Sequence, residues 1–187
     1  MVLDDIYEVD EPKLNSNGDV VGEGLRLPGR ATNVLTERRK HFSSINDDGL
    51  TKFRKWYGVP SFGLTFPALR DEGADYFIPG EVCLYEAPFR FGLRLPIPPF
   101  IKEVLSFYGY APGQLMPNSW RILLGVLVLS ETRNIKVSPQ TIHYAYFPKL
   151  QNGRLQLHVR SGRHLVLTNE KESKRCKWKE GFFLCRI

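Results

Sequence analysis

The sequence has few cysteines, and their positions do not suit a disulfide framework. Its 187 residues include three, Cys83, Cys176 and Cys185, an odd number at wide spacing. Small disulfide-stabilised domains carry an even number of cysteines at closer spacing. We therefore expect reduced thiols.

Long apolar runs and targeting signals are also missing. The longest nearly unbroken apolar run, from Ile122 to Leu129, spans eight residues, whereas a transmembrane helix needs roughly 20. The first ten residues are acidic and lack the basic leader and apolar stretch of a secretory signal. These absences predict a protein of the cytoplasm or nucleus that does not enter a membrane.

Common catalytic and nucleotide-binding motifs are absent too. The sequence contains no Gly-x-x-x-x-Gly-Lys-Ser/Thr loop, no Gly-x-Gly-x-x-Gly turn and no Gly-x-Ser-x-Gly elbow. We therefore expect no enzyme activity, no cofactor and no small-molecule substrate.

Two groups of residues have metal-ligand chemistry, but neither has the spacing of a known site. Asp71, Glu72 and Asp75 could offer oxygen ligands, without the glycine hinge and bidentate glutamate of a calcium loop. A second group lacks the short paired spacings of zinc knuckles and fingers; it consists of His158, His164, Cys176 and Cys185. We interpret both groups as ordinary loop, surface or core residues.

The chain does have enough apolar residues for a core. Hydrophobic residues make up 42% of the sequence and aromatic residues 12%, which suits one folded domain of this length. Residues 1–45 lack helical or alternating periodicity and predict a disordered N-terminal arm. Residues 46–187 are expected to form the domain.

Helical spacing of apolar residues, with proline, glycine and capping residues at the ends, predicts five helices. The expected ranges are 47–57, 81–91 with a kink at Pro88, 98–108, 120–132 and 138–147. Residues 61–80 are expected to form a loop or a short extended stretch. Alternating or apolar runs predict strands at 155–159, 164–167 and 182–187, with a turn at 161–162. The fold class is therefore α+β, with a helical core of four to five short helices and a small C-terminal antiparallel β appendage.

Positive charge is concentrated near the C-terminus. The net charge is +6 overall, and residues 149–187 carry ten Lys and Arg against three Glu, which leaves the first 148 residues at −1. A basic run with one aromatic residue could bind single-stranded RNA or DNA; it comprises Lys171, Lys174, Arg175, Lys177, Trp178 and Lys179. Three interspersed glutamates favour the alternative of a solvated face, in which Trp178 packs the end of the domain.

Three segments occur in a fixed order: 80–86 (GEVCLYE), 91–100 (FGLRLPIPPF) and 110–121 (YAPGQLMPNSWR). This succession, together with the Lys-Trp-Lys and Phe-Phe of residues 177–183, resembles the plant transposon protein domain, a gag-like N-terminal domain of plant gypsy-type retrotransposons. The resemblance extends from about Leu50 to the C-terminus. It implies a non-enzymatic structural protein of a transposable element that acts through protein assembly, with no catalytic residue to carry over.

Three functional alternatives stay open at this point: assembly as a homo-oligomer, binding of RNA or DNA by the basic segment, and a functionless relic of an element. An aromatic set could serve assembly, although its helical spacing favours the core; its members are Phe89, Phe91, Phe100, Phe107, Tyr108 and Trp120. Arg94 and Arg121 lie within the resembling segments, and we expect them to bond carbonyl groups at helix ends.

Overall fold

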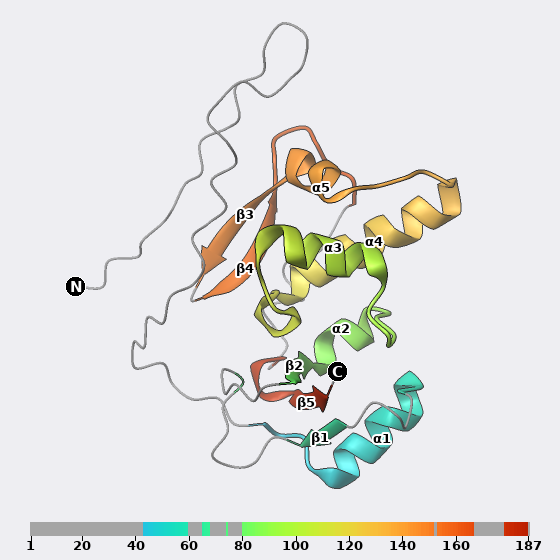
Figure 1. Cartoon of the computed structure of the whole chain (residues 1–187), viewed down its shortest axis with the longest axis vertical. Helices are drawn as coiled ribbons and strands as arrows, with labels where there is room; N and C mark the ends of the chain where they lie inside the picture. Colours follow the sequence, from blue (N-terminus) through green and yellow to red (C-terminus); the bar gives the residue numbers. More distant parts are fainter. Residues whose placement is uncertain are drawn as a thin grey trace, which may run out of the picture.

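The computed structural model describes residues 43–59, 65–67, 74, 80–151, 153–166 and 178–186. These residues form five α-helices and two small antiparallel sheets (Figure 1), which confirms the α+β class. Within them, no helix combines the length and apolar character that crossing a membrane requires. Residues 1–42, most of the expected disordered arm, lie outside the described ranges.

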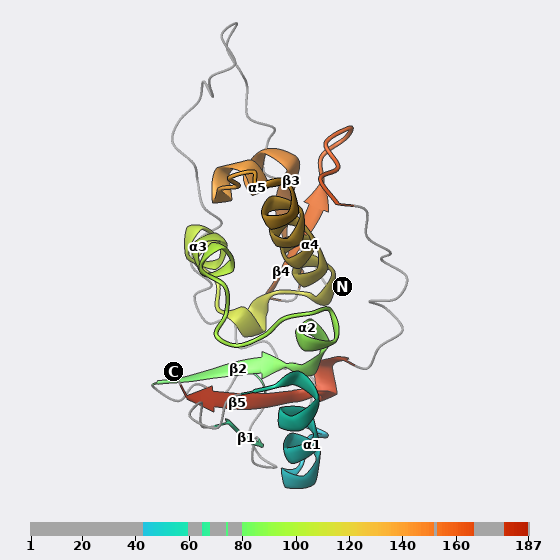
Figure 2. The ribbon, with the colours of Figure 1, turned by 90° about the vertical axis from the view of Figure 1, so that its right-hand side faces the viewer.

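The C-terminal strand is the middle strand of a small antiparallel sheet. Strand β5 (Phe182–Arg186) lies between β1 (Thr65–Pro67) and β2 (Glu81–Tyr85), and both pairings are antiparallel (Figure 2). Phe182 and Phe183 of β5 are completely buried. The strand predicted at 182–187 is therefore confirmed, and its apolar side chains belong to the core.

The helix predicted at 81–91 is wrong in its first half. Residues Glu81–Tyr85 form β2, and only Glu86–Arg90 form helix α2. Pairing with β5, in which Cys83 faces Leu184, favours the strand, because strand preference depends on packing against cross-strand neighbours. Pro88 then falls in the first turn of α2, where its missing N–H is not needed.

Helices α1 (Asp47–Tyr57) and α3 (Pro99–Tyr108) confirm the predictions at these positions. The Asn46 side chain accepts a hydrogen bond from the backbone N–H of Gly49, and Gly58 ends α1 at φ 62°. Gly109 ends α3 in the same left-handed conformation. The glycine stops read from the sequence therefore set the C-terminal ends of both helices.

Helix α4 (Pro117–Arg133) lies at the centre of the domain, as its apolar circumference predicts. Trp120 is 1% exposed and Leu123 is completely buried. The hydroxyl of Ser119 accepts a hydrogen bond from the N–H of Leu157 at 2.8 Å. The 110–121 segment thus contains the residues that join α4 to the second sheet.

The second sheet is a hairpin of β3 (Tyr146–Gln151) and β4 (Arg154–Val159). Helix α5 (Pro139–Ala145) begins at the Ser138 cap, as predicted, but ends before residue 147 because Tyr146 already pairs with Val159. The turn at 161–162 is confirmed, whereas His164 to Val166 form no strand. Val166 instead packs on α4, 2.8 Å from where a Cβ on Gly125 would lie.

Candidate functional site

The predicted basic segment is described only at its end. Lys171, Lys174, Arg175 and Lys177 lie outside the described residues, and Lys179 is exposed. Trp178 opens a short 3-10 helix, η2 (Trp178–Glu180), and is 9% exposed. Its indole ring packs edge-on against Tyr85, with ring centroids 5.0 Å apart.

Arg154 covers the same indole from the hairpin. Its guanidinium lies 4.8 Å from the Trp178 ring and 5.1 Å from the Tyr85 ring, and its Nη1 donates to the Gly113 carbonyl at 3.4 Å. A ring held in this way is not open to an incoming base. These contacts favour the alternative in which Trp178 packs the end of the domain.

The described members of the His and Cys candidate metal group are not brought together. His158 stacks on Phe147 in the β3–β4 hairpin, whereas Cys185 lies in β5 of the other sheet. Among the described residues, no three His, Cys, Asp or Glu side chains could share an ion. Asp71, Glu72, Asp75 and Cys176 lie outside those ranges.

The aromatic set faces inward, as its helical spacing predicts. Phe89, Tyr108 and Trp120 are at most 2% exposed. The others, Phe91, Phe100 and Phe107, are partly buried against the same core. Aromatic side chains of these helices therefore serve packing, and an assembly surface must be sought elsewhere.

Arg94 and Arg121 both have structural contacts. Arg94 Nη1 donates to the carbonyl oxygen of Phe89, near the end of α2, at 3.3 Å and to that of Leu93 at 2.7 Å, which confirms its predicted role. The guanidinium of Arg121 lies 4.1 Å above the ring of Phe91. Sequence reasoning did not predict that stacking contact.

A buried cationic group lies between α3, α5 and the end of β4. Arg160 is 4% exposed, and its Nε donates to the His143 carbonyl at 3.3 Å, at the C-terminal end of α5. Partial negative charge at that helix end offsets the charge of the guanidinium. The Nδ1 of His143 lies 3.4 Å from the Tyr108 hydroxyl. Burial, and then the charge of Arg160, lowers the pKa of His143, while burial raises the pKa of Tyr108.

Several large apolar side chains in and near the C-terminal half of α4 are exposed. This half of α4 lies at the end of the domain remote from α1 (Figure 1). Val128 and Leu129 in the last turns of α4 are 61% and 40% exposed, and Ile135 just after the helix is 55% exposed. Leu165 is 36% exposed, next to the Val166 that packs on Gly125. Because Leu129 follows Gly125 by four residues, it lies on the same face of α4 as that contact. We call Val128, Leu129, Ile135 and Leu165 the apolar end.

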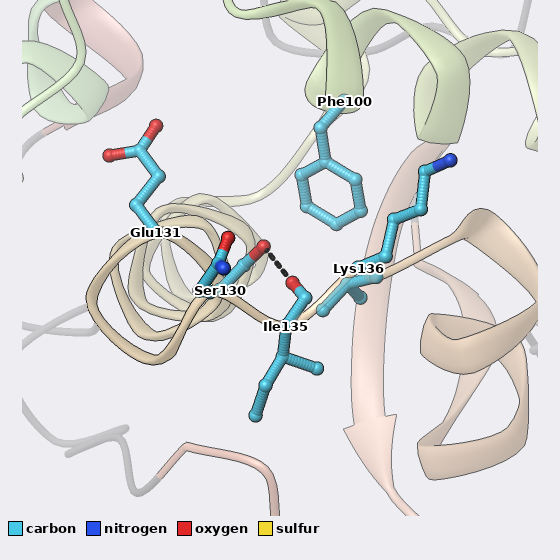
Figure 3. Close-up of a pocket in the computed structure, with 7 residues that line it drawn as sticks. Phe100, Ser130, Glu131, Ile135 and Lys136 are labelled. Atoms are coloured by element: carbon cyan, nitrogen blue, oxygen red, sulfur yellow. Dashed lines mark hydrogen bonds between the residues drawn. The ribbon is translucent and has the colours of Figure 1, made fainter.

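A shallow pocket adjoins the apolar end. It is lined by Phe100 of α3 and by Ser130, Glu131, Asn134, Ile135, Lys136 and Val137. Figure 3 shows Phe100 pointing into it, while the Ile135 side chain points away toward the other side of α4. The Ser130 hydroxyl donates to the Ile135 carbonyl at 2.6 Å and fixes the chain after the helix. The lining has one glutamate and one lysine and no group arranged for catalysis.

Comparison with known families identifies the centre of the chain. Residues 82–150 match the model of the family described as "Putative gypsy type transposon". This segment is therefore similar to a gypsy-type transposon domain. The match supports the gypsy-type part of the resemblance, and the family description names no catalytic activity. No curated protein and no solved structure matches the chain.

The matched segment spans β2 to β3 and so contains α4 and most of the apolar end. Sequence reasoning treated α4 as a helix buried on every side and therefore missed the exposure of Val128 and Leu129. A signal was available, because polar Ser130, Glu131, Thr132 and Arg133 follow directly and indicate that the helix leaves the core there.

Proposed function

We propose that this transposon-related chain is a non-enzymatic structural protein, and that copies of it associate through the apolar end. The observation that carries the proposal is the exposure of Val128 and Leu129 on a helix whose first half is buried. Apolar side chains that gather at one place on a surface are typical of a contact with another protein.

The apolar end is suited to a second copy because its flanking charges have both signs. Exposed Glu131, Arg133 and Lys136 lie around it. In a two-fold pairing of one segment with its copy, a residue before the axis position contacts the residue of the second copy that lies equally far after that position. An axis near Thr132 would place Leu129 against Ile135 of the second copy, and Glu131 against Arg133.

The first test compares the wild-type chain with Val128→Glu. Glutamate is a better helix former than valine at this exposed position, so the variant should fold while it places a charge in the contact. Light scattering after size exclusion, across a dilution series, should show a wild-type mass that rises with concentration and a monomeric variant.

Ser106→Glu is the matched control, because it adds the same charge at an exposed position of α3. It should associate as the wild type does. A wild-type chain that stays monomeric at every concentration, or a Val128→Glu variant that associates normally, would overturn the proposal.

A further inference from the structure

The opposite end of the molecule has a different kind of surface, centred on Trp56 of α1. Trp56 is 68% exposed, more than any other large apolar side chain that the structure describes. The sequence pattern had placed it with Leu50 and Phe53 on the buried face of this helix. Leu50 and Phe53 are indeed 3% exposed, but Trp56 lies outside that face.

The packing of α1 explains why the indole stays outside. The Phe53 ring contacts both Phe89 and Phe183, with centroids 4.8 and 4.7 Å apart. Tyr57 lies beside the same cluster, 5.9 Å from Phe89. These rings fill the core side of the last turn of α1. Trp56 precedes Tyr57 by one residue, so its side chain is rotated by about 100° around the helix axis from that of Tyr57.

The exposed neighbours of Trp56 on α1 are cationic. Lys52 precedes Trp56 by four residues and therefore lies on the same helical face. Lys55 directly precedes Trp56 and follows Lys52 by three residues, so it borders the same face. Both lysines are exposed. The acidic residue on this face, Asp48, is two turns before Trp56, about 12 Å along the helix axis.

Arg94 extends this surface beyond the helix. It is exposed, and its guanidinium lies 5.7 Å from the centre of the Tyr57 ring, next along the chain from Trp56. The loop after α2 thus adds a fixed positive charge near the C-terminal turn of α1. We call Lys52, Lys55, Trp56 and Arg94 the α1 face.

We propose that the α1 face binds single-stranded nucleic acid, with an unpaired base stacked on the Trp56 indole and neighbouring phosphates held by Lys52, Lys55 and Arg94. Aromatic rings among cations are the usual means of binding unpaired strands, because every base has a face that can stack. Bases of a duplex are already stacked and would not reach the indole. This site is independent of the apolar end and of the proposed assembly.

The net charge of the chain supports a polyanion over an apolar protein partner. The sequence has 26 Lys and Arg against 20 Asp and Glu, a net charge of +6. Such a charge attracts nucleic acid and makes the affinity fall as salt rises. An indole flanked by two lysines on one helix face concentrates that attraction at one place.

Tryptophan fluorescence gives a direct readout on the whole chain. Trp120 is 1% exposed and Trp178 is 9% exposed, so a base can stack only on Trp56 among the three tryptophans. Titration with a 12-nucleotide oligo(U) at low salt should quench part of the emission. The same titration at high salt should show weaker binding.

Variants locate the site. Trp56→Ala should abolish the quenching and weaken binding of a labelled oligo(U) by about tenfold, as loss of one stacked base does, whereas Trp56→Phe should retain most of the affinity. Lys52→Glu should weaken binding more than Lys102→Glu, which makes the same charge change on α3.

Equal effects of the two lysine variants would show attraction by net charge alone and would overturn the proposed site. So would wild-type affinity in Trp56→Ala, absence of salt-dependent binding, or a Trp56-dependent dimer that forms without nucleic acid.

Discussion

His143 shows how one buried side chain couples this fold to pH. Its imidazole Nδ1 lies 3.4 Å from the Tyr108 hydroxyl, and burial, followed by the Arg160 charge, lowers the pKa of His143 below the usual value. The folded state therefore favours the neutral ring. An unfolded chain takes up the proton at an ordinary pKa of about 6.5.

Stability should consequently fall as the pH drops through about 6.5, because only the unfolded state gains a proton there. The loss should stop once the folded pKa is passed. Urea unfolding of the wild type and of His143→Gln between pH 8 and pH 5 checks this. The difference between the two unfolding free energies should be constant above about pH 7.5 and change below it.

His164→Gln, at an exposed loop position, is the control and should keep the wild-type profile. A His143→Gln profile parallel to that of the wild type over the whole range would contradict the assignment.

At the scale of elements, the contact between α4 and β4 depends on one buried hydroxyl group. Ser119 is completely buried; it accepts from the Leu157 N–H at 2.8 Å and lies 3.4 Å from the Leu155 carbonyl. Met116 N–H adds a bond to the same carbonyl at 2.9 Å. Without the hydroxyl, the Leu157 N–H would be buried without a partner.

Ser119→Ala should therefore lower the free energy of unfolding by about 1–3 kcal/mol. Chemical denaturation measures this free energy of unfolding. Ser106→Ala, at an exposed position of α3, is the control and should change the free energy of unfolding by less than about 0.5 kcal/mol. Equal stability of Ser119→Ala and the wild type would refute the structural role of this hydroxyl.

Elements with local end signals could be predicted from the sequence, and elements that depend on distant pairing could not. Gly58 and Gly109 act within one turn of their helices, so the ends of α1 and α3 were predicted correctly. Residues Glu81–Tyr85 have an apolar pattern that suits helix or strand, and β5, about 100 residues away, decides between them.

The same distinction applies to surfaces. Helical spacing placed Phe53 and Trp120 in the core correctly, but it also assigned the exposed Trp56 and Val128 to the core. The spacing of apolar residues does not show where the neighbouring packed elements end. The family resemblance fixed the order of the segments without indicating which side chains are exposed.

At the scale of the whole molecule, the two proposed surfaces lie at different ends. Most of the net positive charge belongs to residues 149–187, which sum to +7, whereas the first 148 residues sum to −1. The apolar end lies around the C-terminus of α4 and the α1 face lies at the opposite end (Figure 2). Association at one end therefore leaves the other free to bind nucleic acid.

Cross-linking at Thr132 tests the central claim of two-fold association most directly. Thr132 is exposed between Leu129 and Ile135, and Thr132→Cys would place two thiols near the proposed axis. A short bismaleimide should convert this variant to a covalent dimer at concentrations where the wild-type chain and Lys102→Cys stay monomeric on a denaturing gel. Dimer yields equal in all three chains would contradict association through the apolar end.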